Sequence, residues 1–418
     1  MTWTRPGRLY RKLTRAGLTT RPVLEVSTER TGTIGDSDIR EVKIRRGKSS
    51  AGGGADPAIA TVSLKGSGGL QYGGDVAVRL GDDFAAELAA RIGQTPERLA
   101  PRFFGRFGPM RTTDNGRTLW DEFEAVSWIA QASISSWSIS LTAGITIPSA
   151  VRALLTPPGE LKDKITLEFP GAWDTLHEPQ PDATYEDTAP KLTRDIGVLL
   201  APLRDGGNRL INMPWRRDRA LDNLTASVAL GRRHVLAPTT WEQPTEAPGD
   251  VYRVRWTDET GASRLSVTDD GDPATYAGRV TELDWRYVRF YTEQWRHMFA
   301  LSAQSSTSRF TIPTVTIDLL ALVTSPLPWD RRVAALLLVL ESGDHVYLGG
   351  DWPGTFAGIY FAEGITETIS GDSWTIELAL VPYTHVTGTQ TPDIQPYYWD
   401  QVNGTWDSQT ATWNTISA

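Results

Sequence analysis

The sequence predicts a mainly β protein, and three observations support this fold class. Apolar and polar residues alternate with a period of two over much of the chain, which is the pattern of half-buried strands. Clusters of Pro and Gly interrupt the alternation, as turns do. Helical periodicity is confined to short segments. Each of two strand-rich blocks has enough strands to close a small barrel, and closure removes exposed sheet edges. We therefore expect two β-barrel-like tube domains separated by an inserted α+β region, with an extended Trp-rich C-terminal tail.

Six alternating segments mark the predicted strands. In each of them the apolar residues occupy one face, because successive side chains of a strand point to opposite sides. The segments carry Val42 and Ile44; Ala60, Val62 and Leu64; Val76, Val78 and Leu80; Ile139, Leu141, Ala143, Ile145 and Ile147; Tyr252, Val254 and Trp256; and Trp374, Ile376, Leu378 and Leu380.

Few helices are expected. Asp83 can cap a short helix with Phe84, Leu88 and Ile92 on one side. The triplet Thr95-Pro96-Glu97 is typical of a cap followed by a first-turn Pro and a first-turn acid. Around residues 275–300 apolar residues fall at mostly helical intervals, but their β-branched and aromatic character leaves helix and strand both open. They are Tyr276, Val280, Leu283, Tyr287, Tyr291 and Trp295.

A chain of 418 residues is long enough for two to four domains. The joints are predicted where Pro and Gly gather: in the loop 49–56, at 156–159, along 178–191 and after Tyr383. The expected parts are a basic N-terminal arm (1–21), a first β-barrel domain (22–145), a middle inserted α+β region (146–300), a second β-barrel domain (301–388) and the extended Trp-rich tail (389–418).

The composition allows a buried core and excludes several kinds of site. The hydrophobic content is 40%, and 16 Trp, 12 Tyr and 11 Phe add large buried area per residue. The chain has no cysteine, so disulfides, thiolate metal sites and a Cys nucleophile are excluded. The longest apolar run, Val333 to Leu340, is too short to cross a bilayer, and residues 1–12 lack the apolar core of a signal peptide. We expect no stable membrane insertion.

Charge is distributed unevenly within a net charge of −8. Residues 1–21 contain six basic residues and no acid, whereas the last thirty residues contain Asp393, Asp400 and Asp407 and no base. Opposite charges at the two ends suit contacts between chains, although a solvated basic arm is an equally acceptable interpretation. Nucleic-acid binding is less favoured, because nothing else extends the basic patch. The partner-contact candidates of the arm are Arg8, Arg11, Lys12 and Arg15.

The C-terminal stretch WDQVNGTWDSQTATWNT places Trp399, Trp406 and Trp413 seven residues apart. The residues between them are poor helix formers, so a coiled coil is disfavoured. The repeat suits an extended segment that turns at Asn403-Gly404. Because Trp offers much contact area for few rotatable bonds, we expect the three to be partner-contact residues that dock on the protein's own body, a neighbouring subunit or a sugar.

No catalytic, cofactor-binding or metal-binding residue is predicted. Arg46-Gly47-Lys48-Ser49 matches the end of a phosphate-binding loop, but Val42 stands where that motif needs glycine, and no G-x-S-x-G elbow occurs. Five histidines are scattered without metal-ligand spacing: His177, His234, His297, His345 and His385.

Tryptophans recur beside acids, which leaves a carbohydrate-related function open. Trp rings stack on sugars, and a pair of carboxylates can cleave a glycoside. A Trp-rich strand protein also places some Trp beside acids by chance, and chance is the favoured explanation. The pairs are Trp120-Asp121, Trp173-Asp174, Trp241-Glu242, Trp329-Asp330, Trp399-Asp400 and Trp406-Asp407.

Three blocks in a fixed order carry a family resemblance. The first runs from Glu41 through the Gly-rich loop to Leu64, the second from Arg102 to Val126, and the third from Gly343 to Leu378. This order resembles the minor tail proteins of long-tailed bacteriophages of actinobacteria, the class that forms the tail-tip or baseplate hub. The resemblance covers about residues 22–145 and 310–418. One departure is Ser127, which stands where the family's strand usually ends in Asp.

The resemblance implies a non-enzymatic virion protein of the phage tail tip without cofactors. It implies a homotrimeric hub that joins the six-fold tail tube to three-fold tip or fibre proteins and lines the DNA-exit channel. The implied partners are a distal tail or tail-tube ring protein, tail-tip or fibre proteins and a tape-measure protein, with DNA present only in transit. A receptor- or glycan-binding tail protein is the alternative, and a cell-wall glycosidase is a more distant one.

Overall fold

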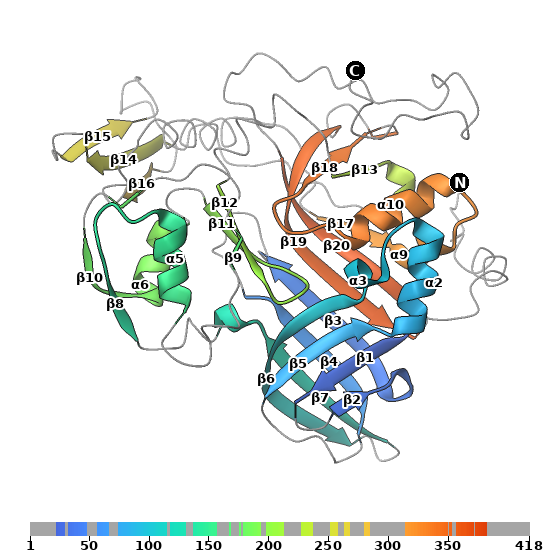
Figure 1. Cartoon of the computed structure of the whole chain (residues 1–418). Helices are drawn as coiled ribbons and strands as arrows, with labels where there is room; N and C mark the ends of the chain where they lie inside the picture. Colours follow the sequence, from blue (N-terminus) through green and yellow to red (C-terminus); the bar gives the residue numbers. More distant parts are fainter. Residues whose placement is uncertain are drawn as a thin grey trace.

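The computed structural model describes the greater part of both strand-rich blocks and parts of the middle region (Figure 1). The described residues are 22–29, 32–47, 57–66, 74–114, 118–130, 137–156, 167–168, 175–176, 179–193, 198–212, 227–236, 251–257, 263–267, 280–284, 314–349, 351–352, 357–371 and 373–382.

Strands dominate these residues, and the helices are short. The strands are β1 (Leu24–Thr28), β2 (Gly32–Ile34), β3 (Ile39–Gly47), β4 (Ile59–Lys65), β5 (Asp75–Leu80), β6 (Pro101–Asp114), β7 (Leu119–Val126), β8 (Ser138–Leu141), β9 (Leu167–Glu168), β10 (Gln180–Thr184), β11 (Val198–Pro202), β12 (Asn208–Asn212), β13 (Val228–Leu230), β14 (Val251–Thr257), β15 (Ser263–Val267), β16 (Val280–Asp284), β17 (Thr314–Asp318), β18 (His345–Leu348), β19 (Gly358–Ser370) and β20 (Ser373–Pro382). The helices are α2 (Asp82–Ile92), α3 (Pro96–Leu99), α5 (Ile147–Leu155), α6 (Tyr185–Thr193), α9 (Leu319–Thr324) and α10 (Pro328–Leu338), with 3-10 turns η1 (Asp36–Asp38) and η3 (Arg232–His234).

One large sheet unites the two strand-rich blocks. It has twelve strands in the order β13-β18-β19-β3-β4-β7-β6-β5-β1-β2, with β20 beside β19 and β17 beside β20. Its pairs are antiparallel except for β13 with β18, so the sheet is mixed. The mainly β class is confirmed. Within the described residues, however, no pairing closes the sheet into a barrel, because strands of one block continue the sheet of the other.

The two blocks meet along β19. One edge of β19 pairs with β18 up to Phe361 and then, from Gly364 onward, with β3. The opposite edge pairs with β20 from Tyr360 to Ser370. We call the changeover, residues 362–364 of β19 with the end of β3 at Gly47, the junction. Gly47 has a φ of +74°, and a side chain there would collide with the Glu363 carbonyl and the Ser342 hydroxyl, so glycine is required.

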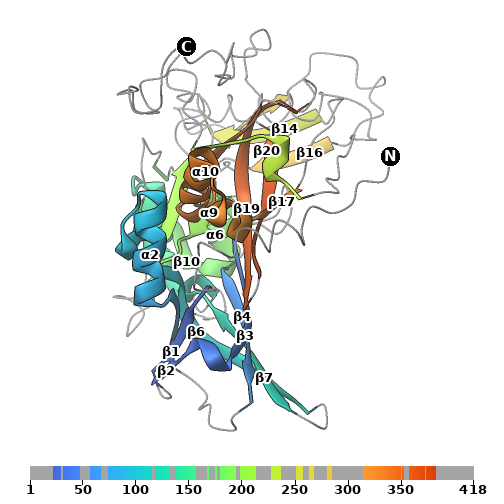
Figure 2. The same cartoon turned by 90° about the vertical axis from the view of Figure 1, so that its right-hand side faces the viewer.

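The described helices that pack on this sheet lie on one face of it. Phe84 and Leu88 of α2 join Val333 and Leu337 of α10 in the main core, above the apolar faces of the strands. Figure 2 shows α2, α9 and α10 on the same side of the strands. The helix expected after Asp83 is present, but Gly81 occupies its N-cap position and Asp83 lies in its first turn. The helix expected at Thr95-Pro96-Glu97 is confirmed as α3, with Thr95 at the N-cap position.

The middle region has smaller sheets and its own core. β8 pairs with β10, β12 pairs with β11 and β9, and β14 pairs with β15 and β16. Helices α5 and α6 contribute to a second apolar cluster with Trp128, Leu141 and Leu210. The middle region differs from the sequence prediction at one segment and decides an open assignment at another. The strand predicted over 139–147 ends at Leu141, and Ile147 begins α5, because a turn at Gly144 (φ +81°) and Pro148 in the first helical turn redirect the chain. Residues 280–284, where helix and strand were both open, form β16.

Candidate functional site

The partner-contact residues proposed from sequence lie outside the described residues. These are Arg8, Arg11, Lys12, Arg15, Trp399, Trp406 and Trp413. Within the described residues, the large sheet carries the candidate features, which are a mostly polar face on one side and a buried charged cluster on the other.

On β3, β4 and β7, the face of the sheet opposite the helices is mostly polar, and its described side chains are exposed or partly exposed. On β3, Glu41 and Lys43 are exposed, whereas Val42 and Ile44, which alternate with them, are fully buried on the other side of the sheet. The same alternation continues on β7, where Glu122 and Glu124 are exposed. We call this side the hydroxyl face, because Thr and Ser dominate its centre.

Cross-strand register shows how the hydroxyl face is ordered. One row crosses six neighbouring strands, from β17 to β7, and consists of Asp318, Thr375, Thr368, Lys43, Thr61 and Glu124. The adjoining row consists of Ser373, Ser370, Glu41, Ser63, Glu122 and Arg111. The two rows contain four acidic side chains and two basic ones, so acidic residues are in excess but basic residues lie among them. Such a surface can remain hydrated without binding one charged partner strongly.

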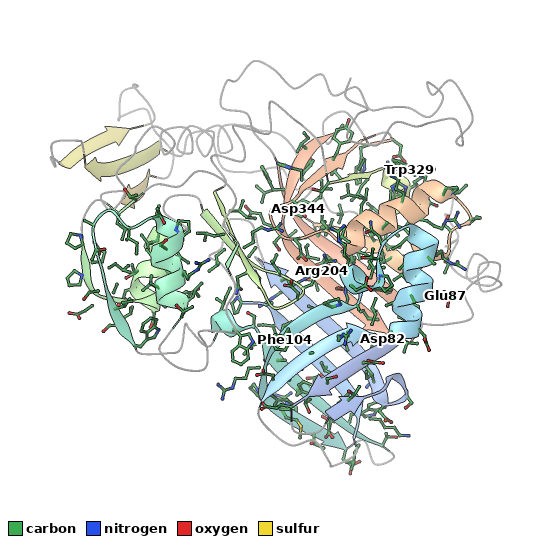
Figure 3. All side chains as sticks on the ribbon, in the orientation of Figure 1. Asp82, Glu87, Phe104, Arg204, Trp329 and Asp344 are labelled. Carbon is green, nitrogen blue, oxygen red and sulfur yellow. The ribbon has the colours of Figure 1, made fainter. Side chains whose placement is uncertain are left out.

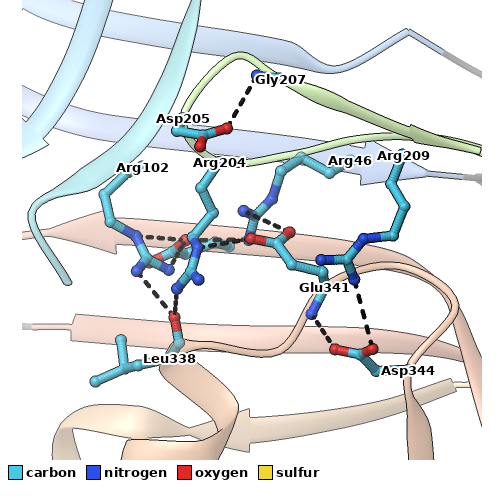
Figure 4. A network of polar contacts seen from close by, with 10 residues as sticks. Arg46, Arg102, Arg204, Asp205, Gly207, Arg209, Leu338, Glu341 and Asp344 are labelled. Carbon is cyan, nitrogen blue, oxygen red and sulfur yellow. Dashed lines mark hydrogen bonds and ion pairs between the residues drawn. The ribbon is translucent and has the colours of Figure 1, made fainter. Parts of the chain in front are cut away.

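On the covered face, a charged network lies at the junction (Figure 4). Arg102 of β6 directs Nε and Nη2 to Oε2 of Glu367 at 3.1 and 2.6 Å. Arg46 of β3 lies 3.9 Å from the same oxygen and 3.4 Å from Oε2 of Glu341. Trp374 donates its indole N–H to Oε1 of Glu367 at 2.8 Å. A buried carboxylate is thus satisfied on both oxygens, as its burial requires.

The network also caps α10. The carbonyl of Leu338 ends this helix and accepts a hydrogen bond from Arg102 Nη1 at 3.2 Å and a second from Arg204 Nη1. Arg204 also places Nε 2.7 Å from Oε1 of Glu341. Guanidinium groups at this position complement the negative end of the helix dipole. The network therefore joins five parts of the chain by direct polar contacts: β3, β6, β19, the C-terminal end of α10 and the turn between β11 and β12.

Burial perturbs the ionisation of these groups. Burial alone would raise the pKa of Glu367, but Arg102 and Arg46 hold it below its ordinary value. Burial lowers the pKa of Arg46, and Glu341 opposes that change. Burial, together with Arg102 and Arg46, lowers the pKa of Arg204 to about 10, although Glu341 favours its charged form. Glu367 and Arg204 are therefore charged at neutral pH.

Sequence reasoning missed this network, although a signal was present. Arg46 continues the buried positions Val42 and Ile44, and Glu367 lies between the buried residues Ile365 and Ile369. A charged residue on an otherwise apolar face indicates a buried ion pair. Sequence reasoning weighed Arg46 only as part of an incomplete phosphate-binding motif.

A second polar cluster surrounds His234 near the turn between α9 and α10. Its Nδ1 lies 3.0 Å from the N–H of Gly231, and its Nε2 lies 3.1 Å from Nε of Arg233 and 3.5 Å from Oδ1 of Asp330. Hydrogen-bond donors thus approach both ring nitrogens of His234. The protonated ring carries a hydrogen on each nitrogen, so it could accept neither hydrogen bond. Burial and the Arg233 charge lower the pKa of His234, with Asp330 opposing them.

Two of the six Trp-acid pairs lie in described residues, and their carboxylates are engaged. Asp121 is buried and accepts a hydrogen bond from Thr112 Oγ1 at 2.7 Å. Asp330 accepts one from Ser325 Oγ at 2.6 Å. The guanidinium of Arg40 lies over the Trp120 ring at 4.8 Å and so occupies one face of that ring. These two pairs have structural contacts, and the other four pairs lie outside the described residues.

Ser127, the departure from the family pattern, completes the pairing of β4 with β7. Its Oγ accepts a hydrogen bond from the N–H of Ala58 at 3.0 Å, and its own N–H donates to the Ala58 carbonyl at 2.8 Å. A hydroxyl therefore substitutes for a backbone acceptor at the strand end.

The residues described contain neither a metal-binding cluster nor a membrane-spanning helix. No group of His, Asp and Glu there could hold a metal ion. No described helix is both long and apolar enough to span a membrane.

The architecture is that of solved tail proteins. The tail protein from Neisseria meningitidis MC58 superposes with a TM-score of 0.56 at 12% identity, covering 86% of this chain and 96% of that one. The 43 kDa tail protein of prophage MuSo2 from Shewanella oneidensis gives 0.55 at 11% identity, covering 86% and 98%. Prophage tail protein gp18 from Listeria monocytogenes EGD-e gives 0.49 at 10% identity, covering 86% and 94%. No protein-family model and no curated protein matches the sequence. At these identities the first two superpositions show a shared fold.

Proposed function

We propose that this chain is a structural component of a bacteriophage tail tip. In this role it forms a trimeric hub that joins the six-fold tail tube to three-fold tip or fibre proteins. Its place is in the virion, it performs no enzymatic reaction, and the class it best fits is the minor tail protein of long-tailed actinobacteriophages. The shared fold with tail proteins supports a role in the tail.

The hydroxyl face is the observation that carries the finer proposal. A sheet with helices on one side and a solvated polar face on the other is suited to form a wall between a packed exterior and a water-filled channel. Mixed charges and hydroxyls along Thr375, Thr368 and Thr61 would let DNA pass without strong binding. We propose that this face lines the DNA-exit channel.

Symmetry supplies a second support. Each chain contributes two strand-rich halves, residues 22–145 and 301–388, around the middle region 146–300. Three chains would thus present six halves to a six-fold tube ring, as closed assemblies with repeated contacts require. The halves form one open sheet here, so the proposed ring consists of curved sheet segments in place of closed barrels.

Solution mass tests the hub directly. The purified chain should sediment at about three times its 46.0 kDa mass, and images of the particle should show three-fold symmetry with a central channel. A stable monomer that binds cell-wall sugars on a glycan array would reject the hub in favour of a receptor-binding tail protein. Peptidoglycan lysis that depends on one Asp or Glu would support the glycosidase.

The ends of the chain are proposed to contact partners. We expect removal of residues 397–418, or of 1–21, to weaken binding to a neighbouring tail protein while the large sheet folds normally. Co-sedimentation with the tube ring or tip protein measures the first effect, and circular dichroism the second. Assembly unchanged by both truncations would remove Trp399, Trp406, Trp413 and the basic residues of the arm from the interface.

A further inference from the structure

The turn between β11 and β12 is largely buried, although Asp205 at its tip is exposed. Turns normally lie on the surface because their backbone groups need water. Here Leu203 is 9% exposed, and Gly206, Gly207 and Asn208 are buried. Asp205 satisfies part of the turn by accepting a hydrogen bond from the Gly207 N–H at 2.9 Å. We call β11, this turn and β12 the clamp hairpin.

The clamp hairpin contacts both halves of the large sheet. On the N-terminal half, Gly206 lies so close to the Phe104 ring that a Cβ there would be 2.7 Å from it. On the C-terminal half, Ala201 and Ile211 pack with Phe361 of β19. Figure 3 shows Phe104 and Arg204 in the part of the molecule where the middle region meets the sheet.

The place of contact is the junction itself. Phe361 is the last residue of β19 that pairs with β18, and pairing with β3 begins three residues later. The register of β19 with β20 also shifts between Ala362 and Gly364. A partner change and a bulge thus lie at one point, and a bulge bends its strand and increases the local twist.

Ion pairs also join the clamp hairpin to the C-terminal half. Arg204 of its turn, 12% exposed, pairs with Glu341 and donates to the Leu338 carbonyl. Arg209 of β12 lies 3.9 Å from Asp344. The hairpin therefore brings two cations to carboxylates beside the junction, and its displacement would remove these contacts.

We propose that the clamp hairpin is a conformational coupling element through which the middle region sets the bend of the large sheet at the junction. β12 also pairs with β9, and Leu210 belongs to the core of the middle region, so a shift of that region moves the hairpin. A protein that binds the middle region would shift the angle between the two halves. The inference concerns one folded chain and is independent of whether three chains form a hub.

Hydrogen exchange of the full-length protein, read by mass spectrometry, tests the coupling. In Arg204→Gln we expect amides of 198–212 and of the junction strands, 44–47 and 362–366, to exchange about tenfold faster. Amides of 76–80, in the same sheet but away from the junction, should exchange as in the wild type. The matched control is Arg79→Gln, at an ion pair with Asp82 in which both side chains are largely exposed, and it should change none of these segments.

A second variant separates docking from charge. Gly206→Ala keeps every charge, but it places a methyl group against Phe104 and strains a residue whose φ is +88°, so it should displace the hairpin and give the same exchange pattern as Arg204→Gln. If faster exchange were confined to 198–212 in both variants, the hairpin would only rest on the sheet and the coupling would be disproved. Faster exchange that also reached 76–80 to the same degree would equally overturn it, because it would indicate general destabilisation.

Discussion

The N-terminal half of the covered sheet face and the junction beside it are both closed to water, yet different forces hold them. Around Leu88 the packing is apolar, with Val78, Leu80 and Phe84 as members of the same cluster. At the junction the largest buried side chains include Arg46 and Arg102. Apolar packing is non-directional and scales with area, whereas a buried ion pair depends on every partner. The comparison teaches that equal burial does not mean equal tolerance to substitution.

The largest effect is expected at Glu367. Glu367→Gln keeps the size of the side chain and an acceptor for Trp374, but it leaves Arg102 and Arg46 without their shared anion. We expect the free energy of unfolding, measured by urea denaturation, to fall by about 3–5 kcal/mol. Glu377→Gln, at an exposed position of the neighbouring strand β20, should change it by less than about 0.5 kcal/mol. Equal losses of unfolding free energy in the two variants would show that the buried carboxylate is no more sensitive to substitution than the exposed one.

In the apolar N-terminal half, the loss of unfolding free energy on substitution should depend on side-chain volume and not on charge. Leu88→Ala should lower the free energy of unfolding by about 3 kcal/mol, because Leu88 is fully buried and its removal leaves a cavity. Leu88→Met, which conserves volume, should cost less than about 1.5 kcal/mol. Thermal unfolding followed by circular dichroism would measure both variants. A methionine as costly as alanine would mean that this half is no more tolerant than the junction.

Charge balance at the junction should appear as non-additivity. Glu341→Gln leaves Arg46 and Arg204 both short of a partner, and adding Arg204→Gln removes one of the two unpaired cations. The double variant should therefore be less destabilised than the sum of the single variants by about 1–2 kcal/mol. A double-mutant cycle in urea gives this coupling. Strict additivity would show that the two side chains do not act as a unit.

The smallest effect is expected from pH at His234. Its pKa is lowered in the folded protein, so the unfolded chain binds the proton more readily. The stabilisation that neutral His234 contributes should be complete above its pKa in the unfolded chain, about 6.5. It should be lost progressively as the pH falls below that value. His234→Asn, which keeps an acceptor near the position of Nδ1, should flatten the dependence of stability on pH between about 5 and 7. An unchanged slope would assign the pH dependence to other groups.

Local patterns predicted much of the fold. Alternation at Val42 and Ile44, or at Trp374 and Ile376, reflects one buried face and so identifies strands directly. The strand predicted to continue to Ile147 was wrong because alternation cannot reveal a turn whose cause is a glycine with positive φ. The sharing of one sheet by both blocks could not be predicted, because pairing between β3 and β19 depends on contacts far apart in sequence.

The candidate site was less accessible to sequence reasoning. The hydroxyl face follows from the polar residues of each strand, but their alignment into rows requires the register. The charged network could have been suspected from Glu367 on an apolar strand face, yet its partners Arg102 and Trp374 come from strands that only the topology brings together.

The pairing of β3 with β19 has a consequence for synthesis of the chain. β3 is translated early, whereas residues 364–370, which cover one of its edges, are translated more than three hundred residues later by the numbering of the sequence. During this interval the nascent N-terminal half presents an unpaired strand edge, which is a template for pairing with another chain. Non-local strand pairing is also slow to form. Cells that produce this protein should therefore lose material to aggregation at high rates of synthesis, and slower translation or a chaperone that binds strand edges should raise the soluble yield.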